Sequence, residues 1–129
     1  FMMKIKAPTG EVYNALVDTG STISSISNNV MKKLQLPQYT CRPELIRYGN
    51  NELQMSTQKA ILDFHFNDTD SSQVHVRIVD QQNVDIILGM DWLNKEDITL
   101  HTKSKSVTRT VVSRERTSNN NQCTLSTQD

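Results

Sequence analysis

The sequence predicts an all-β fold with one or two short helices, and three observations lead to this prediction. Short apolar segments recur between residues 2 and 110, and clusters of Gly, Asn, Asp and Pro separate them. The segments with helical spacing are brief. With 129 residues, the chain has the length of one domain and can bury a modest core. We therefore expect one β domain over residues 1–110.

Composition predicts a tail after the domain. Residues 111–129 are mostly Ser, Thr, Asn, Gln and charged residues, so we expect a disordered tail.

Charge, hydropathy and cysteine content limit the kinds of partner that the chain can have. Basic and acidic residues balance at 14 each, which predicts no nucleic-acid partner. The longest apolar run, 86–90, is far too short to cross a bilayer, so no membrane partner is expected. Cys41 and Cys123 form no CxxC pair, which argues against a disulfide framework or metal site and favours an intracellular setting.

The N-terminal third predicts a hairpin, a loop and a helix. Apolar residues at strand spacing flank a turn at Pro8-Thr9-Gly10, which indicates an opening hairpin. Its second strand, Ala15-Leu16-Val17, runs directly into Asp18-Thr19-Gly20-Ser21, so a buried strand ends in a loop that carries one carboxylate. Ser27 is the expected N-cap of a short helix over residues 29–34.

The remaining segments predict hairpins and one more helix. Leu45–Tyr48 and Leu53–Phe66 are the expected arms of a mobile hairpin whose turn holds Gly and Asn. A turn over 68–72, an alternating strand over 74–78 and a buried strand over 85–88 follow. A brief helix over 90–95 and a final hairpin over 98–107 complete the domain.

One short motif gains meaning from its surroundings. Asp18-Thr19-Gly20 alone is a weak signal, because such a tripeptide also occurs in ordinary turns. Here an apolar strand precedes it, and Ile87-Leu88-Gly89 leads into a second short helix later in the chain. The segments ALVDTGSTISSIS and DIILGMDWL together resemble the retropepsin family, and in particular the proteases of gypsy-type LTR retrotransposons. The resemblance covers about residues 3 to 110.

This resemblance implies a closed β fold, half of an acid protease, that acts as a homodimer. Two carboxylates about 3 Å apart cannot both ionise, so they share a proton, and one serves as base while the other serves as acid. The chain has a single Asp-Thr-Gly motif, so the second carboxylate would be Asp18 of another copy. The expected activity is aspartic endopeptidase cleavage of a peptide or polyprotein substrate, with no metal and no cofactor.

The resemblance also assigns roles to residues near Asp18. Thr19 would bond to its symmetry mate across the dimer axis, and Gly20 would let the substrate backbone approach. Ser21 would donate a hydrogen bond to Asp18 and contact substrate. The flap tip that closes on the peptide would be Gly49, Asn50 and Asn51. Apolar pocket walls beside the cleaved bond would be Leu16, Val84 and Ile87.

Three functions remain open at this point. The first is an active intracellular enzyme, cytoplasmic or inside virus-like particles, that processes a retroelement polyprotein. The second is a catalytically silent or domesticated member that serves as an assembly or peptide-binding module. The third is a cellular retropepsin of the DNA-damage-inducible type. The intact Asp-Thr-Gly motif favours the first. Met90 stands where retroviral relatives commonly have an Arg that forms an ion pair, so we expect weak dimerisation. We expect Asp91 to bond backbone rather than to react.

Overall fold

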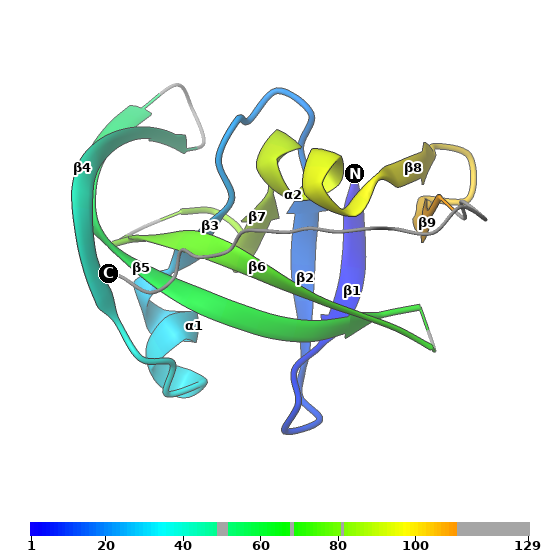
Figure 1. The fold of residues 1–129 in the computed structure, drawn as a ribbon, viewed down its shortest axis with the longest axis horizontal. Coiled ribbons are helices and arrows are strands. Elements are labelled where there is room, and N and C mark those ends of the chain that lie inside the picture. Colours follow the sequence, from blue (N-terminus) through cyan, green and yellow to red (C-terminus); the bar gives the residue numbers. More distant parts are fainter. Residues whose placement is uncertain (49–51, 68, 81, 111–129) are drawn as a thin grey trace, which may run out of the picture.

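A computed structural model describes residues 1–48, 52–67, 69–80 and 82–110. Seven strands form one sheet in the order β1-β2-β7-β3-β6-β5-β4, and two more form a small separate sheet (Figure 1). In chain order the elements are β1 (Met2–Lys6), β2 (Val12–Val17), β3 (Ser25–Ser27), α1 (Asn28–Lys33), β4 (Tyr39–Tyr48), β5 (Glu52–Phe66), β6 (Asp70–Val79), β7 (Ile86–Leu88), α2 (Met90–Glu96), β8 (Ile98–His101) and β9 (Ser106–Arg109). This mostly-β architecture with short helices confirms the predicted fold class.

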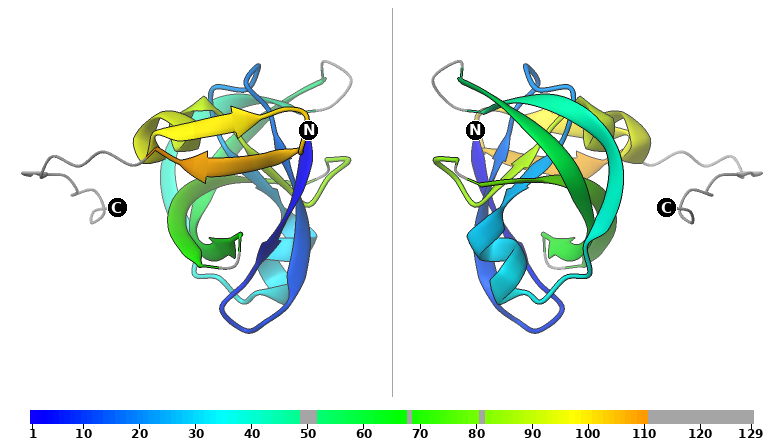
Figure 2. Two further views of the ribbon diagram at one scale, coloured as in Figure 1. Left: turned by 90° about the vertical axis from the view of Figure 1, so that its right-hand side faces the viewer. Right: turned by 90° about the vertical axis from the view of Figure 1, so that its left-hand side faces the viewer.

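The large sheet closes on itself. β1 pairs with β2 along its length, and it also pairs with β5 where Lys6 lies opposite His65. The strands β1, β2, β7, β3, β6 and β5 therefore form a ring, and β4 continues the sheet beyond β5. Figure 2 shows the long strands β4 and β5 curling around the molecule in both side views. A closed sheet has an inner face that only side chains can fill, and this face forms the core.

Helix α2 completes that core. Trp92 is fully buried, with its ring centroid 5.6 Å from that of Phe64 and 5.5 Å from that of Phe66. Its indole N–H donates to the Ser72 hydroxyl at 2.8 Å, so the polar edge of the ring is also satisfied. Every second residue of β5 faces inward here: Ala60, Leu62, Phe64 and Phe66 are all buried. The alternation fixes the register of β5, because a slip by one residue would expose this whole row.

Most predicted elements are confirmed. The opening hairpin is present, with Gly10 at φ 102° in its turn, a conformation that favours glycine. Helix α1 begins after Ser27, whose hydroxyl accepts a hydrogen bond from the Val30 amide at 3.3 Å, as expected of an N-cap. The buried strand β7, the short helix α2 and the final hairpin β8–β9 also lie where the sequence predicts them.

One strand was missed, and two strands begin earlier than the sequence predicts. β3 was not expected, because Ser25-Ile26-Ser27 offers a single apolar residue; pairing with β6 and β7 on its two sides makes it a strand. β4 begins at Tyr39 rather than at Leu45, since a register shift between Thr40 and Glu44 hides its alternation. β6 begins at Asp70, inside the turn expected over 68–72, because Asp70 pairs directly with Phe66.

Two expected features lie outside the described residues. These are the flap tip at Gly49, Asn50 and Asn51 and the tail over 111–129. The flap tip, the tail and the domain boundary near residue 110 therefore stay predictions.

Candidate active site

Asp18 stands at the point where two buried parallel strands end. β2 pairs in parallel with β7, with Val17 opposite Leu88, and the Asp18 amide extends this pairing by donating to the Leu88 carbonyl at 3.0 Å. The carboxyl ends of parallel strands meet at one edge of the sheet, which is where side chains on the following loops can gather. Asp18 is therefore the first residue after the buried strand β2, and its backbone is still held by a hydrogen bond to β7.

The loop after Asp18 folds back tightly. The Ser21 amide donates to the Asp18 carbonyl at 3.1 Å, and the Gly20 amide donates to Asp18 Oδ1 at 2.9 Å. A backbone N–H that points at a carboxylate oxygen fixes the rotation of the side chain. The Asp18 side chain is half-buried, whereas Thr19 and Gly20 are exposed. One carboxylate is thus presented to solvent in a defined orientation.

The first turn of helix α2 packs against this loop and hydrogen-bonds to it. A Cβ added to Gly89 would lie 2.6 Å from the Ser21 carbonyl oxygen, so only glycine lets the two segments approach this closely. The Met90 amide donates to that same oxygen at 2.7 Å, and the Asp91 amide donates to the Thr22 carbonyl at 3.2 Å. The first amides of a helix have no partner within the helix, and here the loop carbonyls supply it.

Ser24 and Asp91 form a second connection between the loop and α2. The buried Ser24 hydroxyl donates to Asp91 Oδ1 at 2.6 Å and accepts from the Gly89 amide at 2.9 Å. Asp91 Oδ2 accepts from the Ser24 amide at 3.0 Å. The expectation that Asp91 bonds backbone is confirmed. This network joins the loop to α2 without the Arg that retroviral relatives commonly have at position 90.

The expected hydrogen bond from Ser21 to Asp18 is not formed in the single chain. The Ser21 hydroxyl donates instead to the Ile23 carbonyl at 2.9 Å. The loop turns back at Ser21 and brings that carbonyl within reach, while the Gly20 amide already serves Asp18 Oδ1.

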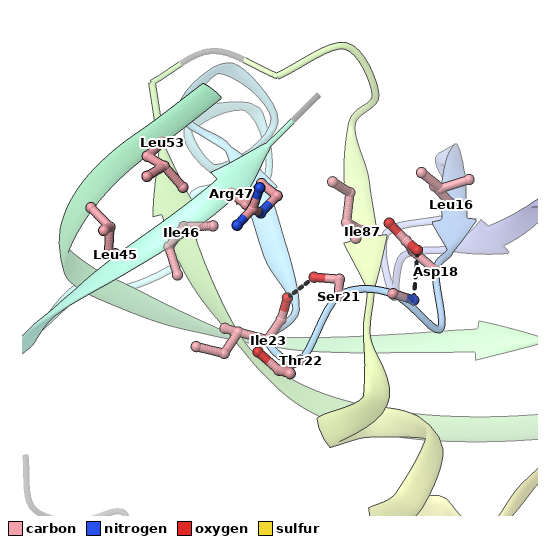
Figure 3. Close-up of a pocket in the computed structure, with 11 residues that line it drawn as sticks. Leu16, Asp18, Ser21, Thr22, Ile23, Leu45, Ile46, Arg47, Leu53 and Ile87 are labelled. Atoms are coloured by element: carbon pink, nitrogen blue, oxygen red, sulfur yellow. Dashed lines mark hydrogen bonds between the residues drawn. The ribbon is translucent and has the colours of Figure 1, made fainter. Parts of the chain in front are cut away.

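A cavity of about 580 Å³ opens beside the Asp18 carboxylate. Its size is typical of sites that hold small ligands or a few side chains. In Figure 3 the Asp18 loop and β7 lie on one side of this cavity, and the β4–β5 hairpin lies on the other. The apolar lining residues are Leu16, Ile23, Leu45, Ile46, Leu53 and Ile87, and the others are Asp18, Gly20, Ser21, Thr22 and Arg47. The carboxylate therefore faces a hollow with both apolar and polar walls.

Register explains why two of the predicted wall residues meet in the cavity. Leu16 and Ile87 are opposite each other on β2 and β7, so their side chains share the outer face of the sheet, away from the core. Val84, the third, does not line this cavity. It precedes β7, which begins only at Ile86, so strand alternation does not set its direction. Thr19, which was assigned to the dimer axis rather than to a pocket, is exposed and also does not line it.

Sequence reasoning missed the lining residues that the β4–β5 hairpin supplies. Leu45, Arg47 and Leu53 lie on its arms, and Leu45 and Leu53 are 56% and 51% exposed. The hairpin itself was predicted, but only its tip was assigned a role. The signal that would have identified this wall is the presence of leucine residues on both arms of the predicted hairpin, near its turn.

Two further features, a metal-binding group and a membrane-spanning helix, are absent from the described part of the chain. No group of three or more His, Cys, Asp and Glu side chains among them is arranged to bind a metal ion. No helix within the described ranges is long and apolar enough to cross a membrane.

Comparisons with known proteins agree with this geometry. Residues 8–95 match the family described as "gag-polyprotein putative aspartyl protease". The retroviral protease-like domain of Ddi1 from Leishmania major has a similar solved structure, with a TM-score of 0.64 and 13% sequence identity over 86% of this chain and 88% of that chain. A likeness at that identity shows the fold alone. Comparison with curated proteins finds no match. With its family match over residues 8–95, its retropepsin-like closed sheet and its Asp-Thr-Gly loop, the chain belongs to the gag-polyprotein aspartyl protease family.

Proposed function

We propose that the chain is an aspartic endopeptidase whose active form is a homodimer with one Asp18 from each copy. The observation that carries this proposal is the Asp18 carboxylate, which is oriented by the Gly20 amide at the edge of a cavity with apolar and polar walls. A single chain offers one such carboxylate on one Asp-Thr-Gly motif. A two-fold axis beside the loop would supply the second.

The chemistry follows from the pair. Two adjacent carboxylates share one proton, so one carboxylate removes a proton from water while its partner donates one to the substrate carbonyl oxygen. The water oxygen bonds to the carbonyl carbon, and the resulting tetrahedral intermediate is bound to the enzyme by hydrogen bonds alone. The leaving nitrogen then accepts a proton from the pair, the C–N bond breaks, and one hydroxyl of the intermediate returns its proton to the pair. The products are a carboxylic acid and an amine, and the pair returns to its starting state.

Neighbouring residues would support these steps. Thr19 would bond to its symmetry mate and hold the two loops in register, and Gly20 would leave room for the peptide backbone. Ser21, Leu16 and Ile87 would contact substrate side chains. The flap tip at Gly49, Asn50 and Asn51 would cover the peptide. The substrate proposed for this dimer is the polyprotein of a retroelement, in keeping with the gag-polyprotein family to which the chain belongs.

A non-cleaving peptide-binding module is the second candidate. The cavity exists in a single chain and offers the β4–β5 hairpin as one wall, so it could hold a peptide without a second carboxylate. The fold shared with the Ddi1 domain also leaves room for a cellular role in place of a retroelement role.

Cleavage of a peptide pool separates these candidates. A pool of tryptic peptides, with their termini blocked so that new termini can be detected, is incubated with the chain. The chain is used at high concentration, which favours the dimer, and between about pH 4 and pH 7, where a carboxylate pair can hold one proton. We expect new termini to appear with wild type, to vanish with Asp18→Asn and to be suppressed by pepstatin-like inhibitors. Asp63→Asn, which alters an exposed carboxylate on β5, is the matched control and should cleave as wild type does. Cleavage that survives Asp18→Asn, or no cleavage by wild type at any concentration, contradicts the proposal.

A further inference from the structure

The cavity beside Asp18 has one cationic side chain in its wall. Among the described residues that line it, Asp18 and Arg47 are the charged ones, and most of the others are apolar. Arg47 lies on β4 directly opposite Leu53 on β5, while Leu45 lies two residues earlier on the same face of the hairpin. Leu45 and Leu53, both half-exposed, are therefore neighbours of Arg47 on this face of the hairpin.

Asp18 and Arg47 come from opposite sides of the cavity. Figure 3 shows Arg47 on the side of the β4–β5 hairpin, with Leu16 and Asp18 on the far side and Ile87 between them. A peptide that passes between the hairpin and the Asp18 loop would meet the carboxylate on one side and the guanidinium on the other. Its apolar side chains would contact Leu16 and Ile87.

Arg77 and Arg47, two of the arginines near this hairpin, are used differently. Arg77 is tied to the framework: its Nη1 donates to the carbonyls of Arg42 and Ser56, and its Nη2 lies 3.6 Å from Glu44. Arg47, in contrast, is exposed and forms part of the cavity wall. It has an interaction within the chain, but a guanidinium has five N–H donors and can bind a carboxylate alongside it.

We propose that Arg47 is a specificity-determining residue that selects peptides with an acidic side chain near the bond to be cleaved. A planar guanidinium binds a carboxylate through two parallel hydrogen bonds, which gives direction as well as attraction. A lysine at the same substrate position would be repelled, and a glutamine would lose the charge. The part of this inference that concerns cleavage rests on the proposed function, whereas the peptide-binding part does not.

Synthetic peptides test the preference directly. Internally quenched peptides are built on a sequence cleaved in the pool experiment, with Glu, Gln or Lys placed at each position on either side of the cleaved bond in turn. We expect wild type to prefer Glu over Gln by about tenfold in kcat/KM at one of these positions, the size typical of one charge-assisted hydrogen-bonded contact. The preference should shrink with added salt, because the site is open to solvent. Arg47→Gln should remove the preference, and Arg47→Glu should reverse it toward Lys.

Arg42→Gln is the matched control. Arg42 is an exposed arginine of the same strand, and it does not line the cavity. It should keep the wild-type preference. If wild type shows no preference for Glu, or if Arg47→Glu keeps the wild-type order, the inference fails while the proposed protease activity stands.

Binding separates this failure from a failure of the proposed function. If wild type cleaves no peptide, the protease proposal fails, and Glu and Gln versions of one fluorescent apolar peptide are compared by anisotropy on the Asp18→Asn chain. Tighter binding of the Glu version, reversed by adding Arg47→Glu, supports Arg47 as the selecting residue of a peptide-binding module. Equal dissociation constants for both versions overturn the inference.

Discussion

At the scale of single residues, the Ser24 hydroxyl connects the loop that carries Asp18 to helix α2. It is fully buried, and it donates to Asp91 while accepting from the Gly89 amide. A buried N–H left without a partner costs its full desolvation energy, which is larger than the net gain from an average hydrogen bond. The hydrogen-bonded group of Ser24, Gly89 and Asp91 therefore stabilises the fold as well as supporting the site.

Ser24→Ala should lower the free energy of unfolding by about 1 to 3 kcal/mol, because the Gly89 amide loses its partner in a buried place. Urea unfolding followed by the fluorescence of Trp92, the one tryptophan of the chain and fully buried, measures this change. Ser104→Ala is the control, since the Ser104 hydroxyl contacts Ser106 in an exposed turn. Equal stability of the two variants would show that the Ser24 network contributes nothing measurable.

At the scale of elements, the β5–β6 hairpin carries a titratable pair on its outer face. Lys59 Nζ lies 3.1 Å from His75 Nδ1, on neighbouring strands. Burial lowers the pKa of His75, and the ammonium groups of Lys59 and Lys95 lower it further, with Asp91 acting in the opposite direction. The folded chain thus favours the neutral imidazole, which can accept a hydrogen bond from Lys59.

The sign of the resulting pH dependence follows from proton binding. Between the lowered pKa of the folded chain and the ordinary value of 6.5, the unfolded chain binds more protons at His75 than the folded chain does. Stability therefore falls as the pH drops below about 6.5. His75→Gln stays neutral and should make the stability of the chain less sensitive to pH in this window, as urea midpoints at several pH values would show. His65→Gln, on the exposed face of β5, should keep the wild-type slope, and an unchanged slope in His75→Gln would refute the assignment.

At the scale of the whole molecule, the proposed activity needs two copies of a chain that folds around a single closed sheet. The Asp18 loop stands at one edge of that sheet, and each copy would contribute one carboxylate and the cavity beside it. Without the Arg ion pair of retroviral relatives, the Ser24 network supports the loop within each copy, and it does not itself join two copies.

Mixing experiments test this dependence on two copies. When Asp18→Asn chains are added to a fixed amount of wild type, wild-type chains enter mixed dimers with one carboxylate, so the cleavage rate should fall. Added Asp63→Asn chains should raise the rate instead, because they form active dimers. If the cleavage rate does not change when Asp18→Asn chains are added, a single chain is active by itself.

The sequence by itself determined the fold class, most hairpins, both helices and the Asp-Thr-Gly loop, because these depend on local signals such as alternation, turn residues and the Ser27 cap. It did not determine β3, whose three residues become a strand only through partners on both sides. It also missed Arg47 and Leu53 as cavity residues. Those assignments depend on how a distant hairpin curves over the Asp18 loop. Only the closed sheet brings these segments together, because contacts between residues far apart in the chain are set by packing and not by local pattern.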